Sequence, residues 1–486
     1  MKRIEDLCKY VAVKQIVANG VESFANVVFD SRIVMQDDLF VAVKGTVSDG
    51  HSFIQDVCAK GAAAIVCEKL PEDLNNNVCW ILVNDASLAL AEIAAFYYDF
   101  PSEKLKLVGV TGTNGKTTIA TTLYKLTLKL GYKAGLLSTV RNMICADEVL
   151  ATHTTPDALQ LNKLLREMVR QGCEYCFMEV SSHSVVQNRI AALKFTGGIF
   201  TNITHDHLDY HKTFDQYIKA KKAFFDMLPS SSFAITNNDD KNGEVMLQNT
   251  SAARSSYSLD RVADFKAKII ESHFDGMLLS IDGHEIWTHF VGRFNASNLL
   301  AVYGAAIKLG FQREEILIVL STLHAVDGRF QTIKSSSGII AIVDYAHTPD
   351  ALKNVLTTIQ QIRSKDESII TVVGAGGNRD KTKRPEMAKV ASLLSDRLIL
   401  TSDNPRNEVP EQIISDMEQG LSESAKANTL KIVDRKEAIR TACILAKKGD
   451  VILVAGKGHE NYQEIMGVKH PFDDREIVTE IFKTLK

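Results

Sequence analysis

Residues 107–118 read LVGVTGTNGKTT, and this stretch carries the strongest structural signal in the sequence. Residues 105–109 predict a short apolar strand, and residues 119–130 predict a helix rich in helix-forming residues. A strand, a glycine turn and a helix N-terminus together bind phosphate, because backbone N–H groups and the helix dipole favour an anion there. Lys116 adds a mobile cation, and the hydroxyl of Thr117 stands where it can ligate Mg²⁺.

The strict phosphate-loop pattern G-x-x-x-x-G-K-[ST] is not fully met. Val110 stands where the pattern requires its first glycine, and glycines occur instead at Gly109, Gly112 and Gly115. The alternative is an ordinary strand–turn–helix with chance glycines. A lysine at 116, followed directly by two hydroxyl residues, favours the phosphate loop.

The length and charge of the chain limit its possible functions. With 486 residues, we expect two to four domains. The formal net charge is −3, so no overall attraction to nucleic acid or to an anionic membrane is expected. No stretch approaches the ~18 apolar residues of a membrane-spanning helix. The first residues, MKRIEDLCKY, include acidic residues where a signal peptide needs an apolar run.

The eight cysteines are scattered along the chain, and most lie within apolar runs. This usage is typical of reduced core cysteines, so we expect a cytoplasmic protein. The pair Cys173-x-x-Cys176 could serve redox or metal chemistry. We expect core packing instead, because the sequence has no second CxxC and a buried strand begins there.

Alternating strands and helices predict an α/β protein with three domains. We expect these domains at residues 1–103, 104–330 and 331–486. The first boundary follows a predicted helix at 87–99, which ends before Pro101. The sequence contains no low-complexity linker, so we expect clefts between the domains.

Each domain has its own pattern of predicted strands. In the first domain the strands are expected at 21–29, 39–43, 62–67 and 78–83. In the central domain they are expected at 134–138, 175–180, 196–203 and 233–237. These alternate with helices, which favours a largely parallel sheet, while shorter strands at 255–290 predict an antiparallel edge. In the third domain they are expected at 339–344, 368–373, 397–400, 430–433 and 451–454.

Polar clusters follow three predicted strands of the central domain, at residues 153–155, 179–183 and 201–207. Ligands on parallel sheets collect at such strand ends. Glu179 ends an apolar strand, and a buried strand rarely ends in Glu without a partner. We therefore expect Glu179 to ligate Mg²⁺, with a capping or salt-bridge role as the alternative.

Two further segments suggest metal chemistry. Residues 205–211, HDHLDYH, do not have the H-x-H-x-D-H spacing of metallo-β-lactamases, so we favour Mg²⁺ with His207 as a ligand over a zinc pair or a helix-capping loop. Lys219, Lys221 and Lys222 read by default as a solvated helix face. A lysine crowded by like charges favours its neutral amine, which can take up CO₂ and become a carbamate that binds Mg²⁺.

Eight motifs occur in an order that resembles the Mur ligases. They are TGTNGKTT (111–118), MEVSSH (178–183), NITHDHLDYH (202–211), GRFNASN (292–298), VDYAHTPDAL (343–352), GGNRDKTKRP (376–385), DNPR (403–406) and AGKGHE (455–460). The resemblance covers all three domains. It implies an N-terminal α/β UDP-binding domain, a central P-loop ATPase domain and a C-terminal Rossmann-like domain that binds an amino acid.

The resemblance implies the residues that bind ATP and metal. For ATP they are Gly112, Thr113, Asn114, Gly115, Lys116, Thr117, Thr118, Asn295, Arg329 and Asp344. For two Mg²⁺ ions they are Thr117, Glu179, His207 and carbamylated Lys221, with the Y-x-x-A-K register selecting Lys221 over its neighbours. The implied catalytic residues are Lys116, Glu179, His207 and Lys221.

The resemblance also implies residues for the other two substrates. The UDP-N-acetylmuramoyl-L-alanyl-D-glutamate site would comprise Phe29, Ser31, Thr46, Val47, Ser48, His153, Thr154, Thr155, Ser181, Gln187 and Arg189. The diamino-acid site would comprise Arg379, Asp403, Asn404, Pro405, Arg406, Gly456 and Glu460. His153 departs from the Asn of some family members.

The implied reaction is an ATP-dependent amide ligation in peptidoglycan precursor synthesis. Its partners would be small molecules only, with no nucleic acid and no membrane insertion, and the protein would be a monomer. We expect meso-2,6-diaminopimelate as the added amino acid, because Arg406 offers a planar fork for a distal carboxylate and Asn404 is neutral. The alternatives are an L-lysine-adding Mur ligase, a folylpolyglutamate synthase-like ligase, or a P-loop protein that uses ATP as a switch.

Overall fold

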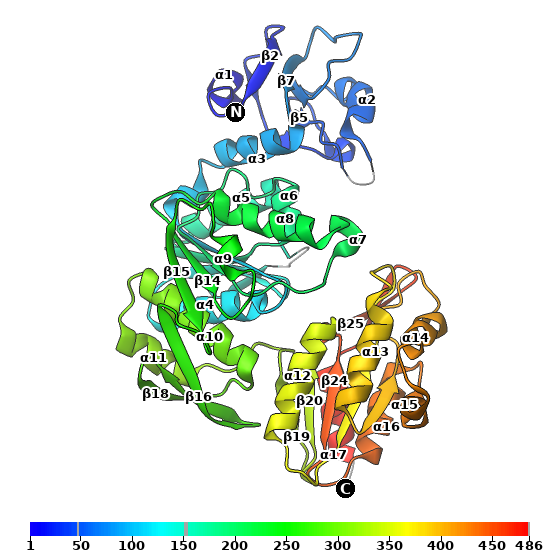
Figure 1. Cartoon of the computed structure of the whole chain (residues 1–486). Coiled ribbons are helices and arrows are strands. Elements are labelled where there is room, and N and C mark those ends of the chain that lie inside the picture. Colours follow the sequence, from blue (N-terminus) through cyan, green and yellow to red (C-terminus); the bar gives the residue numbers. More distant parts are fainter. Residues whose placement is uncertain (46–47, 150–153, 485–486) are drawn as a thin grey trace.

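The computed structural model describes residues 1–45, 48–149 and 154–484. Its three α/β domains follow one another along the chain, and the central domain lies between the other two (Figure 1). Each domain contains a largely parallel sheet with helices packed against it. The predicted fold class is therefore confirmed.

The N-terminal domain has a five-stranded sheet in the order β2–β7–β6–β5–β4, in which β2 is antiparallel to its neighbour. Its elements are β1 (Lys2–Arg3), α1 (Ile4–Leu7), β2 (Val13–Val17), β3 (Ser23–Phe24), β4 (Val27–Val28), β5 (Leu39–Val41), α2 (Ile54–Ala59), β6 (Ala64–Cys67), β7 (Cys79–Val83) and α3 (Ala86–Tyr97). Helix α3 begins where the Asp85 carboxylate accepts hydrogen bonds from the backbone N–H groups of Ser87 and Leu88.

The prediction of one strand at residues 21–29 is wrong. The segment divides into β3, which pairs with β1, and β4, which pairs with β5. The backbone turns between them because the N–H of Ala25 bonds the carbonyl of Asp37 at 2.7 Å, and the carbonyl of Asn26 accepts from Leu39. Strand β2 was not predicted, since its middle three residues are exposed and the apolar pattern is weak.

The central domain is built on an eleven-stranded sheet in the order β11–β10–β9–β12–β8–β13–β14–β15–β16–β17–β18. Its strands are β8 (Lys106–Thr111), β9 (Ala134–Leu137), β10 (Asn142–Ile144), β11 (Asp147–Val149), β12 (Tyr175–Glu179), β13 (Gly197–Phe200), β14 (Phe233–Asn237), β15 (Ala253–Ser258), β16 (Phe265–His273), β17 (Gly276–Ile281) and β18 (His284–Thr288). The strands from β9 to β16 in this order are parallel, and β16, β17 and β18 form the expected antiparallel edge.

Successive side chains of β8 point to opposite faces of the sheet and therefore pack into two different hydrophobic cores. Val108 and Val110 face the core of α4 and α10, whereas Leu107 faces the core of α5 and α8. The helices of this domain are α4 (Lys116–Lys129), α5 (Ala158–Arg170), α6 (Ser182–Val186), α7 (Leu208–His211), α8 (Phe214–Asp226), α9 (Gly243–Met246), α10 (Arg293–Lys308) and α11 (Arg313–Thr322). Strand β8 is an interior strand of the sheet, between β12 and β13, and the phosphate loop follows its carboxyl end.

The C-terminal domain has a six-stranded sheet in the order β19–β20–β24–β21–β22–β23, and β19 alone is antiparallel. Its strands, with a separate hairpin, are β19 (Gln331–Lys334), β20 (Ile340–Asp344), β21 (Ile369–Val373), β22 (Arg397–Leu400), β23 (Thr429–Lys431), β24 (Val451–Ala455), β25 (Tyr462–Ile465) and β26 (Val468–Pro471). Its helices are α12 (Pro349–Ile362), α13 (Lys383–Leu394), α14 (Pro410–Glu418), α15 (Glu423–Ala427), α16 (Arg435–Leu445) and α17 (Asp474–Thr484). All five predicted strands are present.

All eight cysteines lie within the described residues and are free thiols. Cys173 and Cys176 are buried in the apolar core beneath α5 and α8, so the expected packing role is confirmed. Burial raises the pKa of the Cys176 thiol, which keeps it protonated. Among the described residues, no helix has both the length and the apolar character needed to cross a membrane.

Candidate functional site

The phosphate loop joins β8 to α4 and depends on two glycines with positive φ, Gly112 (151°) and Gly115 (89°). A Cβ at Gly112 would lie 1.8 Å from the hydroxyl oxygen of Thr201, so the backbone can approach only without a side chain. The loop is fixed by Asn202, whose backbone carbonyl and side-chain oxygen accept from the N–H groups of Thr113 and Asn114 at 2.8 and 3.0 Å.

Lys116 begins helix α4, and its ammonium donates to the carbonyls of Gly112 and Thr113, both at 2.9 Å. Burial lowers the pKa of Lys116, although the carboxylate of Glu179 acts in the opposite direction. The described partners of this ammonium are neutral carbonyls. An incoming phosphate would therefore give the lysine a stronger partner than those it has.

Gly109, by contrast, belongs to the strand and not to the loop. A Cβ there would lie 2.5 Å from the ring of Phe224 and 2.9 Å from the side chain of Val180. This glycine allows helix α8 to approach the sheet, which is a packing role.

Glu179 stands at the end of β12 and opposite Val110 of β8, so parallel strand pairing brings it beside the phosphate loop. Its side chain is 1% exposed. Its carboxylate accepts from the hydroxyl of Thr117 at 2.9 Å and from the backbone N–H of Thr139 at 2.8 Å. Within the described residues, its hydrogen-bond partners are neutral donors and no cationic side chain pairs with it.

Lys221 points inward from α8 and is 1% exposed. Its ammonium donates to the carbonyl of Gly112 at 2.8 Å and lies 4.6 Å from the centre of the Tyr217 ring. Lys219 is exposed, and Lys222, whose side chain is 13% exposed, pairs with Asp226 at 2.6 Å. Burial and the nearby Lys116 lower the pKa of Lys221 well below its usual range, which favours the neutral amine.

The three histidines of residues 205–211 take different positions. His207, at a φ of 54°, lines a cavity of about 260 Å³ together with Lys116, Glu179 and Lys221, which we call the main cavity. The ring of His207 lies 3.5 Å from the carboxylate of Asp206. Burial lowers the pKa of the His207 imidazole, and the Asp206 carboxylate opposes that shift. His205 reaches Asp380 of the C-terminal domain at 3.6 Å, and His211 is buried against the hydroxyl of Ser182.

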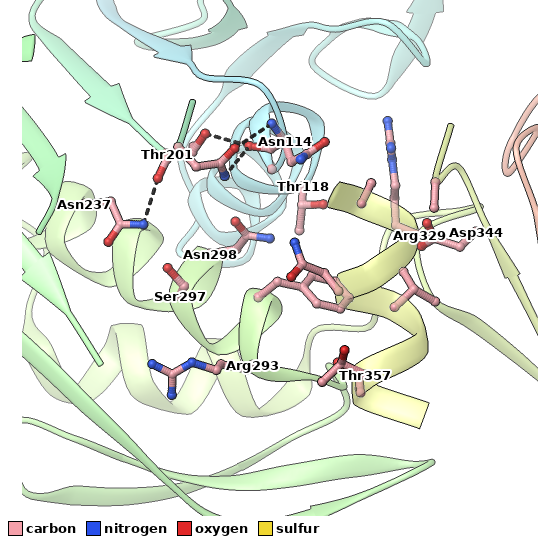
Figure 2. A pocket seen from close by; sticks show the side chains of 18 of the residues that line it. Asn114, Thr118, Thr201, Asn237, Arg293, Ser297, Asn298, Arg329, Asp344 and Thr357 are labelled. Atoms are coloured by element: carbon pink, nitrogen blue, oxygen red, sulfur yellow. Dashed lines mark hydrogen bonds between the residues drawn. The ribbon is translucent and has the colours of Figure 1, made fainter. Parts of the chain in front are cut away.

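A second cavity of about 290 Å³ adjoins the loop and lies between the central and C-terminal domains. Figure 2 shows Asn114, Thr201 and Asn237 on one side of it, and Arg329 and Asp344 on the other. Of the expected ATP residues, those on this lining are Asn114, Gly115, Thr118, Arg329 and Asp344. The loop residues Asn114 and Gly115, with Arg329, border both cavities.

Arg329 links the two domains at this point. Its guanidinium donates to the hydroxyl of Thr117 at 3.2 Å and stacks 4.4 Å above the ring of Tyr345. Asp344 ends β20 and accepts from the backbone N–H of Phe330 at 2.6 Å. Burial raises the pKa of the Asp344 carboxyl to about 6.

Asn295 lies behind the pocket lining instead of on it. It is 1% exposed, its amide donates to the carbonyl of Val291 at 2.9 Å, and its side-chain oxygen accepts from Asn298. Asn298 is the asparagine of this motif that lines the cavity, and its side-chain oxygen would lie 2.5 Å from a Cβ at Gly115.

The residues expected to hold the muramoyl peptide form one hydrogen-bonded chain that starts at Glu179. Its backbone carbonyl accepts from the hydroxyl of Thr155 at 2.9 Å, and Arg189 donates to the carbonyl of Thr155 at 2.7 Å. Arg189 also bonds the side-chain oxygen of Gln187 at 2.6 Å. Thr154 and Ser181 line the main cavity, while His153 lies outside the described residues.

The residues expected to grip the uridine end lie on the N-terminal domain. Phe29 is 38% exposed, and Ser31 begins a 3₁₀ turn where its carbonyl accepts from Lys60. Ser48 is exposed, and Thr46 and Val47 lie outside the described residues. None of the described residues of this domain lines the two cavities.

The expected diamino-acid residues converge on the main cavity from three loops of the C-terminal domain. Those that line it are Arg379, Asp403, Asn404, Arg406, Gly456 and Glu460. Arg406, at a φ of 51°, donates to the carbonyl of Gly377 at 2.8 Å and lies 3.4 Å from the carboxylate of Glu464. The peptide after Pro405 is thus held by the β25–β26 hairpin, whose Glu464 carbonyl accepts from the N–H of Arg406 at 3.0 Å.

Three protein-family models match successive regions of the chain. Residues 23–98 match "Mur ligase family, catalytic domain", residues 110–306 match "Mur ligase middle domain", and residues 328–458 match "Mur ligase, glutamate ligase domain". The chain belongs to the Mur ligase family. Both cavities lie where the second and third matched regions meet.

Individual Mur ligases are similar over nearly the whole chain. Relatives from Parabacteroides distasonis and Phocaeicola vulgatus are 59% and 57% identical over 481 and 480 residues, 99% of each chain. Both carry the name UDP-N-acetylmuramoyl-L-alanyl-D-glutamate–2,6-diaminopimelate ligase. A solved structure of that name has 32% identity, a TM-score of 0.68 and 95% coverage of both chains.

More distant neighbours share the fold. A folylpolyglutamate synthase from Thermotoga maritima is 15% identical with a TM-score of 0.60, and the match covers 82% of this chain and 95% of that one. MurF ligase from the same organism, solved in complex with ADP, is 20% identical with a TM-score of 0.63 and coverage of 94% and 97%.

Several residues of this Mur ligase site were missed by sequence reasoning. Asn202, Asn298 and Lys457 lie inside motifs that resemble the Mur ligases, so their sequence neighbourhood pointed to the site, but no role was predicted for them. Thr139 lies outside every quoted motif, and only the three-dimensional pairing of β9 with β12 brings it to Glu179.

Proposed function

We propose that this Mur ligase joins meso-2,6-diaminopimelate to the D-glutamyl γ-carboxylate of UDP-N-acetylmuramoyl-L-alanyl-D-glutamate, at the expense of ATP, in peptidoglycan precursor synthesis. One observation carries the proposal: a single cavity is lined by Lys116 and Glu179 of the central domain and by Arg406 and Glu460 of the C-terminal domain. A phosphate loop and an amino-acid pocket thus face the same space. The names of the relatives support the choice of substrates.

The main cavity has two walls, and the chemistry follows from what each can bind. The central wall consists of its lining residues from the central domain, and the C-terminal wall consists of those from the C-terminal domain. Lys116 and the loop amides neutralise the triphosphate, so that an anionic carboxylate oxygen can attack the γ-phosphorus. ADP leaves and an acyl phosphate forms. The amine of the amino acid then attacks the acyl carbon, loses a proton and expels phosphate. Arg329, which reaches from the interdomain segment to Thr117, is placed to add positive charge beside the triphosphate.

Mg²⁺ fits the central wall. The buried carboxylate of Glu179 has only neutral donors as described partners, and the hydroxyl of Thr117 lies 2.9 Å from it. Thr117 and Glu179 would hold one ion, and His207, Glu179 and carbamylated Lys221 would hold a second, since oxygen and imidazole ligands suit Mg²⁺. When bound, Mg²⁺ would offset the negative charge of the triphosphate and the substrate carboxylate.

Carbamylation of Lys221 is part of the proposal. Its nitrogen is buried, is favoured as a neutral amine and faces the cavity beside Gly112. A neutral amine adds to CO₂ through its lone pair and releases one proton, which leaves a carboxylate on the side chain. That carboxylate would supply a further oxygen ligand for a second Mg²⁺.

Selection of diaminopimelate over L-lysine rests on Arg406 in this proposal. A guanidinium reads a carboxylate through two parallel hydrogen bonds. The contacts of Arg406 to Gly377 and Glu464 hold it at the cavity before any ligand arrives. L-lysine lacks the distal carboxylate and would leave the guanidinium without that partner.

We further propose that the protein is a cytoplasmic monomer and that each of its three domains binds a different substrate. Residues 1–103 would hold the UDP end through Phe29, Ser31 and residues 46–48, residues 104–330 would bind ATP, and residues 331–486 would bind the amino acid. Removal of residues 1–103 should abolish binding of the muramoyl nucleotide in calorimetry and leave ATP binding in place.

The test is phosphate release from ATP by the wild-type protein, across a panel of amino acids. Release should require both UDP-N-acetylmuramoyl-L-alanyl-D-glutamate and diaminopimelate. Release with a folate and glutamate instead would favour a folylpolyglutamate synthase. Nucleotide binding without any dependence on acceptor would favour an ATP switch.

A further inference from the structure

Lys457 is a fully buried lysine next to the amino-acid pocket. It follows β24 in the AGKGHE motif, its side chain is 0% exposed, and it is not among the residues that line the cavity. Its ammonium donates to the side-chain oxygen of Asn404 and to the carboxylate of Glu460, each at 3.1 Å. A buried ammonium is stable only with such partners, so this lysine is specifically accommodated.

The three side chains close a ring of hydrogen bonds. The amide nitrogen of Asn404 donates to the same carboxylate oxygen of Glu460 at 2.8 Å. The side-chain oxygen of Asn404 also accepts from the backbone N–H of Glu464 at 2.9 Å. Two donors therefore meet the amide oxygen and one acceptor meets the amide nitrogen, which fixes the orientation of Asn404.

The ring leaves one oxygen of Glu460 for a ligand. Among the described residues, both hydrogen bonds to this carboxylate end on Oε2, and the residue lines the cavity. Burial and the nearby Asp403 raise the pKa of Glu460, whereas Lys457 and Asn404 lower it. Without Lys457, Glu460 would lose the ammonium that bonds it directly and would still lie beside Asp403, while the buried Arg435, whose charge also acts on both carboxylates, is paired with Asp474.

We propose that Lys457 is a positioning residue for the amino-acid substrate, which keeps Glu460 ionised and aimed at the substrate ammonium while it fixes the amide of Asn404. This inference rests on the proposed function. Lys457 acts through these two residues and not by contact, because it does not line the cavity.

The first test compares Lys457→Met with Lys469→Met. Both lysines lie near the ring of Tyr462, at 5.5 and 4.3 Å, but Lys469 is exposed on the hairpin and contacts neither Asn404 nor Glu460. Methionine keeps the length of the side chain and removes its charge. Steady-state kinetics should show the KM for diaminopimelate raised roughly tenfold or more in Lys457→Met, as expected when a charge-assisted partner is lost.

The KM values for ATP and for the muramoyl nucleotide should stay within about twofold of wild type, and Lys469→Met should match wild type throughout. An unchanged KM for diaminopimelate in Lys457→Met would overturn the positioning role, as would an equal rise in all three KM values. Wild-type protein that does not use diaminopimelate would instead overturn the proposed function.

A double-mutant cycle guards against misfolding of the single variant. Lys457→Met with Glu460→Gln removes both members of the ion pair, so neither is left buried without the other. If Lys457 acts through Glu460, the double variant should have a diaminopimelate KM within about twofold of Glu460→Gln alone. A further tenfold rise in the double variant would contradict the proposal.

Discussion

The two walls of the main cavity differ in whether the charged side chains expected to bind ligands form ion pairs with the protein. On the central wall, the hydrogen bonds of Lys116 and Lys221 to described residues all end on backbone carbonyls, and those that Glu179 accepts from described residues all come from neutral donors. On the C-terminal wall, Lys457 pairs with Glu460 at 3.1 Å, and Arg406 lies 3.4 Å from Glu464. Behind that wall, Arg384 and Arg435 are also buried in ion pairs.

This difference matches what each wall must bind. ATP and Mg²⁺ bring large charges of their own, so the central wall can leave Lys116, Lys221 and Glu179 without an ion-pair partner among the described residues until those ligands arrive. A diamino acid is a small zwitterion that must be oriented, and paired side chains hold the recognition groups in fixed directions. Loss of a single charge on the central wall should therefore lower the rate of catalysis. Loss of a single charge on the C-terminal wall should instead impair selection of the amino-acid substrate.

Replacement of Lys116 should give the largest effect and would test the central wall. Lys116→Ala should lower kcat about 10²–10³-fold, because the developing charge of the triphosphate loses its cation. The melting temperature should change little, since the hydrogen bonds that the ammonium makes to described residues end on loop carbonyls. Lys129→Ala, an exposed position on the same helix, is the control. Wild-type turnover in Lys116→Ala would refute the phosphate-loop assignment.

Replacement of Lys221 should have the next largest effect. Lys221→Ala should be almost inactive, with kcat lowered about a hundredfold or more, and added short carboxylates should restore part of it by occupying the place of the carbamate. Glutamate at this position should fail, being too short. Lys222→Ala is the matched control, since Lys222 pairs with Asp226. Full activity of Lys221→Ala, with loss in Lys222→Ala, would show that the wrong lysine was chosen.

Replacement of Arg406 would test the C-terminal wall. Arg406→Ala and Arg406→Lys should each lose ~3 kcal/mol of transition-state binding, roughly a hundredfold in kcat/KM for diaminopimelate. The wild type should barely use L-lysine. Arg397→Ala, at an exposed position of β22, is the control. Equal use of the two amino acids by the wild-type protein would remove Arg406 from selection and leave the ligase assignment intact.

The smallest expected effect is that of Asp344→Asn on the pH dependence of the free energy of unfolding. The Asp344 carboxyl has a pKa raised to about 6 by burial, above the usual 3.8, so the folded state binds the proton more tightly than the unfolded state. Stability should therefore fall as pH rises from about 4 to 6, and Asp344→Asn should lessen that fall. At pH 7 the variant should be more stable by about 1–3 kcal/mol in urea unfolding, yet less active. Asp366→Asn, at an exposed site, should show neither change.

Much of the central wall could be predicted because its residues lie in contiguous motifs. Gly112, Lys116 and Thr117 are neighbours in sequence, and their geometry follows from a strand that turns into a helix. Glu179 could be placed beside them because parallel strands end at the same edge of a sheet. The apolar segments predicted most strands of the three sheets, but β2, β10, β11 and β19 were missed.

What could not be predicted depends on long-range contacts. The break at residues 25–26 depends on hydrogen bonds to residues 37 and 39, which no local pattern reveals. The edge strands β2 and β19 are partly exposed and lack a clear apolar period. The ring of Lys457, Asn404 and Glu460 joins loops that are more than fifty residues apart, so its pairing required the fold.

The most direct test of the central claim follows an oxygen atom through the reaction. Wild-type protein would be given ATP, diaminopimelate and the muramoyl nucleotide with ¹⁸O in the D-glutamyl γ-carboxylate. If both walls serve one amide ligation through an acyl phosphate, the product should gain one diaminopimelate residue and the released phosphate should carry one ¹⁸O. Unlabelled phosphate, or phosphate released without amide formation, would contradict the account.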